Sequence, residues 1–308
     1  MMQSAGSIAA VRGWGDVTAA SRGAAQEGLA RGRLVMKGVS KRFANTVVAA
    51  LEDINLAVEP GEFVVVVGPS GCGKSTLLNI AAGMLRADGG TVMLDGHPVD
   101  SPGPDRAMVF QDHGLFPWLN VSQNISFGLR MSGATREQRD ERVEEVLKLI
   151  QMVGCARKLV HELSGGMKQR VAIARALVMD PALLMMDEPF ASLDAQTRTL
   201  LHQQLQEMWL ATRKTILFVT HSVGEAVRLA DRIIVLHAHP GRIRKEIRVA
   251  LPHPRKFDSA DINELAKQVR GEIEEEVNRV NREMAGDEWQ PKASGDVGAD
   301  LVDMGGGI

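Results

Sequence analysis

The 308-residue sequence predicts an α/β fold, in one large domain with a tail at each end. Between about residues 34 and 249, short runs rich in β-forming residues alternate with amphipathic helical runs. The longest apolar runs have the length of strands, as at 63–67. This alternation is typical of a parallel or mixed sheet with helices packed on it.

Individual elements follow from the local pattern. Strands are expected at 34–41, 53–58, 63–67, 91–94, 107–110, 183–186, 216–220 and 232–236. Helices are expected to begin at Gly73, Arg136, Gly165, Ala195 and Val223. The clearest helix covers 136–153, where apolar residues recur at helical spacing among charged ones. That helix should lay one face on a core.

Composition excludes several classes of protein. Hydrophobic residues make up 44% and charged residues 24%, and the formal net charge of -2 gives no general attraction to nucleic acid or anionic lipid. Cys72 and Cys155 lack metal-ligand spacing and form no disulfide framework, which favours a reducing cytoplasm. No segment has the roughly 20 uncharged apolar residues that cross a bilayer. The chain is therefore not expected to form a channel by itself.

The two tails differ in character from the middle. Residues 1–32 contain no apolar stretch typical of a secretion signal, so we expect a disordered leader before a domain at 33–254. Residues 255–308 are expected to form a polar C-terminal tail, helical over about 258–284 and then disordered. We interpret its acidic cluster at 272–276 as a solvated helix face rather than a binding device.

The strand at 63–67 runs into a glycine-rich loop that opens a helix. The loop fills every fixed position of the phosphate-loop pattern G-x-x-x-x-G-K-[ST], which a turn that merely joins strand to helix does not require. Its glycines let backbone N–H groups face phosphate oxygens, and the helix N-terminus favours an anion. We expect Lys74 to reach the β- and γ-phosphates of ATP and Ser75 to coordinate Mg²⁺. The candidate nucleotide-binding residues are Gly68, Pro69, Ser70, Gly71, Cys72, Gly73, Lys74, Ser75 and Thr76.

A pair of carboxylates ends the apolar run at 183–186. Asp187 is expected to hold magnesium, directly or through a water molecule. Glu188, the next residue, is the candidate general base for a water that attacks the γ-phosphate. Such a pair is often only a strand-end cap, but beside a phosphate loop it predicts chemistry.

Motifs between and around these elements identify the kind of phosphate-loop protein. The segment 163–170, Leu-Ser-Gly-Gly-Met-Lys-Gln-Arg, closely resembles the signature sequence of ABC ATPases. Gln111, Asp194 and His221 stand, in the family's order, where its Q-loop, D-loop and switch histidine are found. The resemblance covers about 34–249. It implies a P-loop NTPase fold of the ABC ATPase type, with a mixed sheet core, a helical subdomain at about 112–180 and a small antiparallel β subdomain.

The same resemblance implies a head-to-tail homodimer that sandwiches two ATP molecules. Each ATP would be held by the phosphate loop of one subunit and covered by the signature of the other, formed by Ser164, Gly165 and Gly166. Physically, these residues make a second helix N-terminus able to bind phosphate.

Roles for four more residues follow from the family. His221 is expected to contact the γ-phosphate, Gln111 to serve the metal site and catalysis, and Asp194 to cross the dimer interface. The family often stacks adenine on a tyrosine in an early strand, whereas this chain contains no tyrosine. Phe43 lies where that aromatic is expected, either as the stacking partner or as a core residue.

The segment after Gln111 is apolar and aromatic. In ABC transporters this region forms the groove for a cytoplasmic helix of the membrane subunit, so Phe116 and Trp118 are expected to contact a permease; internal packing is the alternative. The sequences of segments 109–118, 239–243 and 251–255 resemble those of the nitrate/sulfonate/taurine importer family. The resemblance implies an ATPase, peripheral on the cytoplasmic face of the bacterial inner membrane. It would power import of a small solute that a periplasmic or extracellular binding protein delivers to the permease.

One alternative belongs to another class. A soluble ABC ATPase that acts on nucleic acid or ribosomes would have no membrane partner, but such relatives generally carry a long coiled-coil insertion or two cassettes, and neither is found here. A GTP switch would need an Asn-Lys-x-Asp segment, which the sequence also lacks. The sequence identifies neither the transported solute nor the permease.

Overall fold

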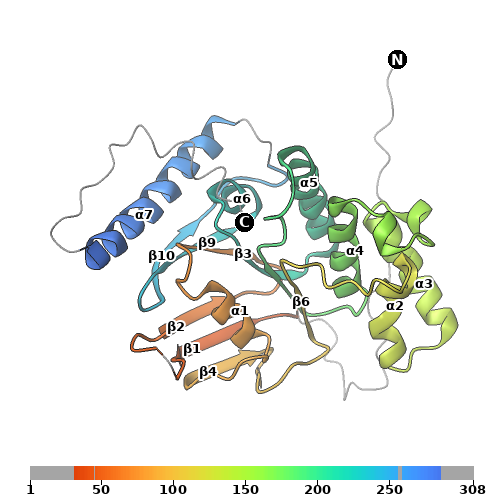
Figure 1. Cartoon of the computed structure of the whole chain (residues 1–308), viewed down its shortest axis with the longest axis horizontal. Coiled ribbons are helices and arrows are strands. Elements are labelled where there is room, and N and C mark those ends of the chain that lie inside the picture. Colours follow the sequence, from red (N-terminus) through yellow and green to blue (C-terminus); the bar gives the residue numbers. More distant parts are fainter. Residues whose placement is uncertain (1–30, 45, 256–258, 286–308) are drawn as a thin grey trace.

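The computed structural model describes residues 31–44, 46–255 and 259–285. Its central sheet comprises β3 (Phe63–Val67), β6 (Arg106–Val109), β7 (Leu183–Asp187), β8 (Thr215–Val219), β9 (Arg232–His237) and β10 (Arg242–Arg248). The order across the sheet is β10-β9-β3-β8-β7-β6 (Figure 1). All neighbours pair in parallel except β10, which runs antiparallel to β9. The sheet is therefore mixed, as predicted.

A second, antiparallel sheet lies beneath the first. It comprises, in order across the sheet, β2 (Leu51–Val58), β1 (Leu34–Lys41), β4 (Gly89–Leu94) and β5 (His97–Pro98). Helix α1 (Lys74–Ala81) lies between the two sheets (Figure 1). Its Leu77 and Leu78 share a buried core with Val64 and Val66 of β3. This sheet is the small antiparallel part that the sequence predicts.

Four helices share the core on the other face of the central sheet: α4 (Gly165–Leu177), α5 (Ala195–Thr212), α6 (Val223–Leu229) and α7 (Ala260–Ala285). Phe63, Val65 and Val67 of β3 point to this side. Successive residues of a strand alternate between faces, so a continuous apolar run such as β3 fits burial on both. A mixed sheet with helices on both faces confirms the predicted α/β fold class.

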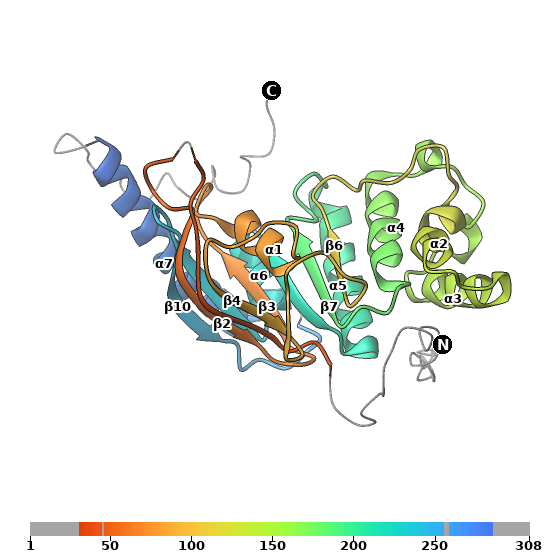
Figure 2. The ribbon, with the colours of Figure 1, turned by 90° about the horizontal axis from the view of Figure 1, so that it is seen from below.

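The helical part lies at the end of the molecule opposite to α7 (Figures 1 and 2). It comprises α2 (Val121–Met131), α3 (Arg136–Leu149) and the short 3₁₀ helices Val153–Cys155 and Val160–Glu162. These elements share a separate core with α4. Among the described residues, no helix combines the length and the apolar character that crossing a bilayer requires.

Several elements differ from their prediction. The sequence analysis does not predict helix α2 or the strands β5 and β10, and the helix expected over 136–153 ends at Leu149. Gln111 lies two residues beyond the end of β6 rather than at its end. The tail forms one continuous helix, α7, as far as Ala285. The rest of the tail, 286–308, and most of the predicted leader lie outside the described residues.

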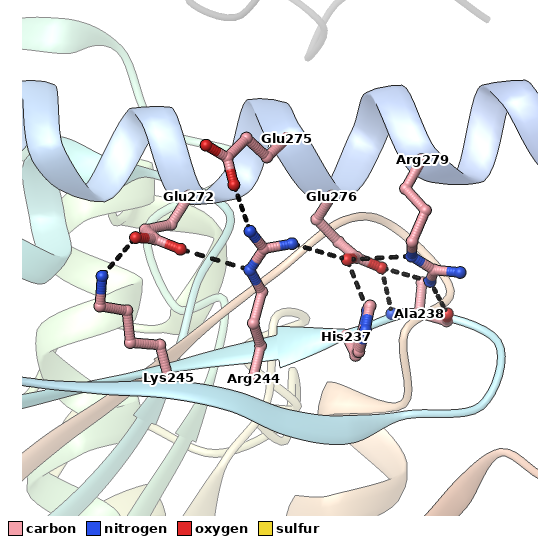
Figure 3. A network of polar contacts seen from close by, with 8 residues as sticks. All are labelled: His237, Ala238, Arg244, Lys245, Glu272, Glu275, Glu276 and Arg279. Carbon is pink, nitrogen blue, oxygen red and sulfur yellow. Dashed lines mark hydrogen bonds and ion pairs between the residues drawn. The ribbon is translucent and has the colours of Figure 1, made fainter.

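The solvated-face interpretation of the cluster at 272–276 is wrong for its most important member. Glu276 is completely buried and bonded to residues of β9, the turn after it and β10, while Glu272 pairs with Arg244 and Lys245 of β10 (Figure 3). Burying a carboxylate is costly unless cations and hydrogen bonds compensate it. The acidic side chains therefore dock α7 on the hairpin that β9 and β10 form.

Two boundary residues also carry contacts. Arg31, placed in the predicted leader, forms an ion pair with Asp180 at 3.8 Å. Arg255 lies one residue beyond the predicted end of the domain and is buried, donating to the carbonyls of Val227 (2.9 Å) and Leu251 (2.8 Å). Burial lowers the pKa of Arg255 to about 10. This guanidinium ties the end of α6 to the segment after β10.

Candidate active site

The predicted chemical groups gather at one edge of the central sheet. The carboxyl ends of parallel strands meet there, so the loop after β3, Asp187 and Glu188 at the end of β7, and His221 after β8 emerge together. An open pocket of about 670 Å³ lies at this edge. Its lining comprises Phe43, residues 46–50, Ser70, Gly71, 73–76, Glu188 and His239.

Glycine is required at particular points of the loop. Gly71 and Gly73 have φ angles of 77° and 95°, which other residues rarely adopt. A Cβ atom at Gly73 would lie only 2.6 Å from the carbonyl oxygen of Ala50, and one at Gly68 2.8 Å from Cys72 Sγ. Cys72 itself is buried, which raises the pKa of its thiol, so it serves the loop by packing.

Positive charge and unpaired N–H groups converge above the loop. Lys74 Nζ donates to the carbonyls of Gly68 and Pro69, at 2.9 Å each, which holds the ammonium beside the loop. Ser75 and Thr76 follow it in the first turn of α1, where backbone N–H groups have no acceptor within the helix. This arrangement fits a bound polyphosphate.

Ser75 of α1 and Asp187 of β7 are the residues that would suit a magnesium ion. Burial raises the pKa of the Asp187 carboxylate, and the nearby Ser75 side chain, a smaller influence, lowers it. The Ser75 hydroxyl and the half-buried Asp187 carboxylate are hard oxygen ligands of the kind that suits this cation. Gln111, the third predicted ligand, is exposed and does not line the pocket.

Glu188 and His221 form a pair at the mouth of the site. His221 Nδ1 lies 3.0 Å from Glu188 Oε2. Glu188 has a φ of 44°, an uncommon conformation for a residue other than glycine. The hydrogen bond between the two side chains lowers the pKa of Glu188 and raises that of His221. Glu188 is thus kept ionised, as a general base must be.

Sequence reasoning missed the residue that supports His221. Glu225 on α6 is buried, accepts a hydrogen bond from Thr220 Oγ1 at 2.6 Å and lies 3.1 Å from His202 Nε2. Thr220 Oγ1 in turn accepts from Ser222 N at 3.0 Å. These bonds fix the backbone on both sides of His221. The Ser-x-x-Glu spacing of Ser222 and Glu225 marks a helix start, and Ser222 Oγ accepts from Glu225 N at 3.4 Å. That local pattern does not reveal the contact with His202, which lies on α5.

Ser164 and Asp194 each cap a helix. Ser164 Oγ accepts from Met167 N at 3.4 Å at the start of α4, and Asp194 Oδ1 accepts from Thr197 N at 2.9 Å at the start of α5. A Cβ at Gly166 would lie 2.4 Å from Thr197 Cγ2, so these two helix starts are packed together. None of the residues 164–166 lines the pocket over the phosphate loop.

Phe43 lines the pocket and is 41% exposed. The alternative interpretation, that it is a core residue, is therefore wrong. Lys41 Nζ lies 5.9 Å from the centre of its ring. One face of the aromatic ring thus borders the same space as the phosphate loop.

The aromatic segment after Gln111 divides between surface and interior. Trp118 is 73% exposed, whereas Phe116 packs on Phe127 with ring centres 4.5 Å apart. The buried side chain of Asn124 accepts from Phe116 N at 2.8 Å and donates to Phe116 O at 3.1 Å. Arg175 lies over the Phe116 ring at 5.6 Å. The segment is therefore fixed from within while it presents Trp118 to solvent.

The Glu188–His221 pair makes the molecule sensitive to pH. Because the pKa of His221 is raised in the folded protein, its stabilising effect is complete below the ordinary value of 6.5 and is lost as pH rises through the raised value. Glu188 has a lowered pKa, so its contribution is present above 4.5 and is lost as pH falls through the lowered value. We expect the pair to stabilise most between these two ordinary values. An NMR titration should show the pKa of His221 falling in Glu188→Gln; an unchanged value would contradict the pairing.

Comparison with known proteins agrees with this site. The family model described as ABC transporter matches residues 51–191. An uncharacterized ABC transporter ATP-binding protein of Methanocaldococcus jannaschii is 47% identical over 75% of this chain and 86% of its own length. A taurine import ATP-binding protein of Jannaschia sp. is 43% identical over 79% of this chain and 92% of its own length.

Solved structures agree as well. The dimeric post-hydrolysis structure of an ATP-binding cassette bound to ADP and Pi matches with a TM-score of 0.62 and 32% identity, over 71% of this chain and 100% of that one. A subunit of an ABC transporter complex of Clostridium perfringens matches with a TM-score of 0.66 and 28% identity, over 82% of this chain and 95% of that one. With the phosphate loop, the carboxylates and His221 at one edge of the sheet, the chain belongs to the ABC transporter ATP-binding family and is an ATPase.

Proposed function

We propose that the chain is the ATP-hydrolysing subunit of an importer for taurine or a related sulfonate. Nitrate is the alternative solute within the same importer family. The observation that carries the proposal is that Lys74 and Glu188 line one pocket, with His221 paired to Glu188, in a chain of this family. The name of the Jannaschia relative supports taurine among the solutes.

Glu188 is the general base in this proposal. Its ionised carboxylate takes a proton from a water molecule whose oxygen attacks the γ-phosphorus of ATP, and the bond from that phosphorus to the β–γ bridging oxygen breaks. His221 holds the carboxylate and presents its ring to the γ-phosphate. Lys74 and the backbone N–H groups of the loop balance the charge on the β- and γ-phosphates.

Magnesium and the nucleobase complete the site. Ser75 and Asp187 would hold Mg²⁺, and Gln111 would join them from the loop after β6. The ion would neutralise part of the negative charge on the phosphates. Phe43 offers its exposed ring to adenine. Gly68, Pro69, Ser70, Gly71, Cys72, Gly73 and Thr76 form the remainder of the cradle.

We assign the second half of the site to another copy of the chain. Ser164, Gly165 and Gly166 lie outside the pocket of their own subunit, at a helix N-terminus suited to phosphate. A head-to-tail homodimer would bring them over the partner's ATP, with Asp194 beside the junction. The dimeric cassette bound to ADP and Pi supports a two-copy assembly.

Trp118 is the proposed contact with a separate membrane permease, at the cytoplasmic face of the inner membrane. A large exposed aromatic on a loop fixed from inside by Asn124 has the properties of an interface anchor. A binding protein outside the membrane would deliver the solute to that permease. Closure of the ATP-bound dimer would draw the permease subunits together, and hydrolysis would reset them.

Hydrolysis by the purified protein tests the site. Glu188→Gln should lower kcat by about 100-fold or more while ATP binding persists, because the base is lost but the cradle is not. Lys74→Ala should instead weaken ATP binding. Phosphate release and equilibrium nucleotide binding are the two measurements, with the exposed Glu59→Gln as control. Normal turnover in Glu188→Gln would refute the assigned base.

Growth of the native host tests the substrate. A host carrying only the Glu188→Gln copy should fail with taurine as sole sulfur source and grow normally with sulfate, because import stops without hydrolysis. Nitrate as sole nitrogen source is tested separately. Growth on taurine equal to that of the parent would reject taurine import, and failure on nitrate alone would move the assignment to nitrate.

Trp118→Ala tests the coupling surface. Truncating an anchor of this kind costs about 2 kcal/mol of binding energy or more, so membrane association of the subunit should weaken about 30-fold. ATPase activity of the isolated subunit should not change. Leu200→Ala on α5, which removes another exposed apolar side chain, is the control. Intact membrane association and uptake in Trp118→Ala would remove the proposed contact.

A further inference from the structure

The turn that follows β9 is packed against the phosphate loop. A Cβ atom at Gly241 would lie 2.4 Å from the carbonyl oxygen of Cys72, and one at Gly68 would lie 3.0 Å from the carbonyl oxygen of Leu236. Leu236 of β9 and Gly241 of the turn are therefore packed directly on the loop. Because the contact is close-packed, a shift of this turn would displace the phosphate loop.

His239 stands at the tip of the turn and lines the same pocket as Lys74 and Phe43. Its side chain is exposed to the pocket, and its φ of 55° is rare for a residue with a side chain. Such a conformation persists only where the surroundings fix it. The motifs that identify the family leave His239 without a role.

The support for the turn comes from α7. Glu276 Oε1 accepts from the backbone N of Ala238 at 2.8 Å, and Arg279 donates to the carbonyl oxygen of the same residue (Figure 3). Both backbone groups beside His239 are thus held by one helix. Glu276 Oε2 also lies 2.5 Å from His237 Nδ1 and 3.3 Å from Arg244 Nη1.

Glu276 is well suited to a fixed position. It has no exposed surface, and although burial pushes its pKa up, hydrogen bonds from Arg279, Ala238 and His237 outweigh this and hold the pKa at about 2. Glu275, one residue earlier, pairs with Arg244 as well but is 71% exposed and does not reach the turn. Glu276 therefore holds the turn, whereas its neighbour Glu275 only helps to dock α7 on β10.

We propose that the turn 238–241 is a wall of the nucleotide pocket, that His239 contacts bound adenine nucleotide, and that Glu276 and Arg279 of α7 are positioning residues for it. This inference rests on the proposed nucleotide site. ATP affinity therefore depends on a helix from the C-terminal tail, although no described residue of α7 lines the pocket.

The test is a double-mutant cycle on the full-length protein, with the KM and kcat of ATP hydrolysis as readouts. His239→Ala should raise KM about five-fold, and Glu276→Gln by a similar factor, with kcat within about two-fold of the parent, since one contact of this kind is lost. Because Glu276 acts through the turn, the double variant should be no worse than either single variant. Glu275→Gln, which removes only the exposed ion pair, should leave KM unchanged.

An unchanged KM in His239→Ala would refute the proposal that the turn lines the nucleotide site. If the two single variants raise KM independently, so that their factors multiply in the double variant, Glu276 does not act through the turn. Circular dichroism and thermal unfolding show whether Glu276→Gln is folded. If it is not, Arg279→Met, which removes the donor to the Ala238 carbonyl, replaces it in the cycle. ATP binding by Lys74→Ala is measured in parallel. If Lys74→Ala loses ATP binding while His239→Ala keeps the KM of the parent, only this inference is refuted. Normal ATP binding by Lys74→Ala would refute the nucleotide site itself.

Discussion

Parallel pairing around β3 is the constraint on which the site depends. β3 pairs with β8 on one side and β9 on the other, and β7 pairs with β8 so that Asp187 lies opposite Val219. A slip of β7 by one residue would move its carboxylates about 3.3 Å along the sheet, away from Ser75 and His221. Strand register therefore determines how the phosphate loop, the two carboxylates and the histidine are aligned.

The parts of the molecule that were predictable are those with a local physical signature. The phosphate loop requires glycines at fixed spacing, and the apolar strand before it is buried on both faces, so both are readable in the sequence. Capping residues such as Asp194 likewise mark helix starts. The family's motifs then indicated the order of the remaining site residues, but not their distances.

The missed elements carry weaker or interrupted signatures; α2 does start with a capping box between Asn120 and Gln123, but its apolar period is broken. Helix α2 carries Asn124 on its buried face, because that amide is needed by the backbone of the aromatic segment, and the polar residue interrupts the apolar period. β10 is an edge strand rich in charge, and its Arg244 and Lys245 become intelligible only when α7 lies beside them. The acidic cluster was misread for the same reason: its partners stand about 30 residues earlier in the chain.

The contacts of Arg255 show that the folding unit continues beyond residue 254. A gene shortened at residue 254, the limit suggested by composition, would delete a guanidinium that satisfies buried carbonyls at the end of α6 and after β10. It would also delete α7 and leave Arg244 and His237 facing an uncovered sheet edge. Recombinant fragments meant to isolate the cassette should therefore run through Ala285, and affinity tags are better placed before residue 31 than close behind that helix.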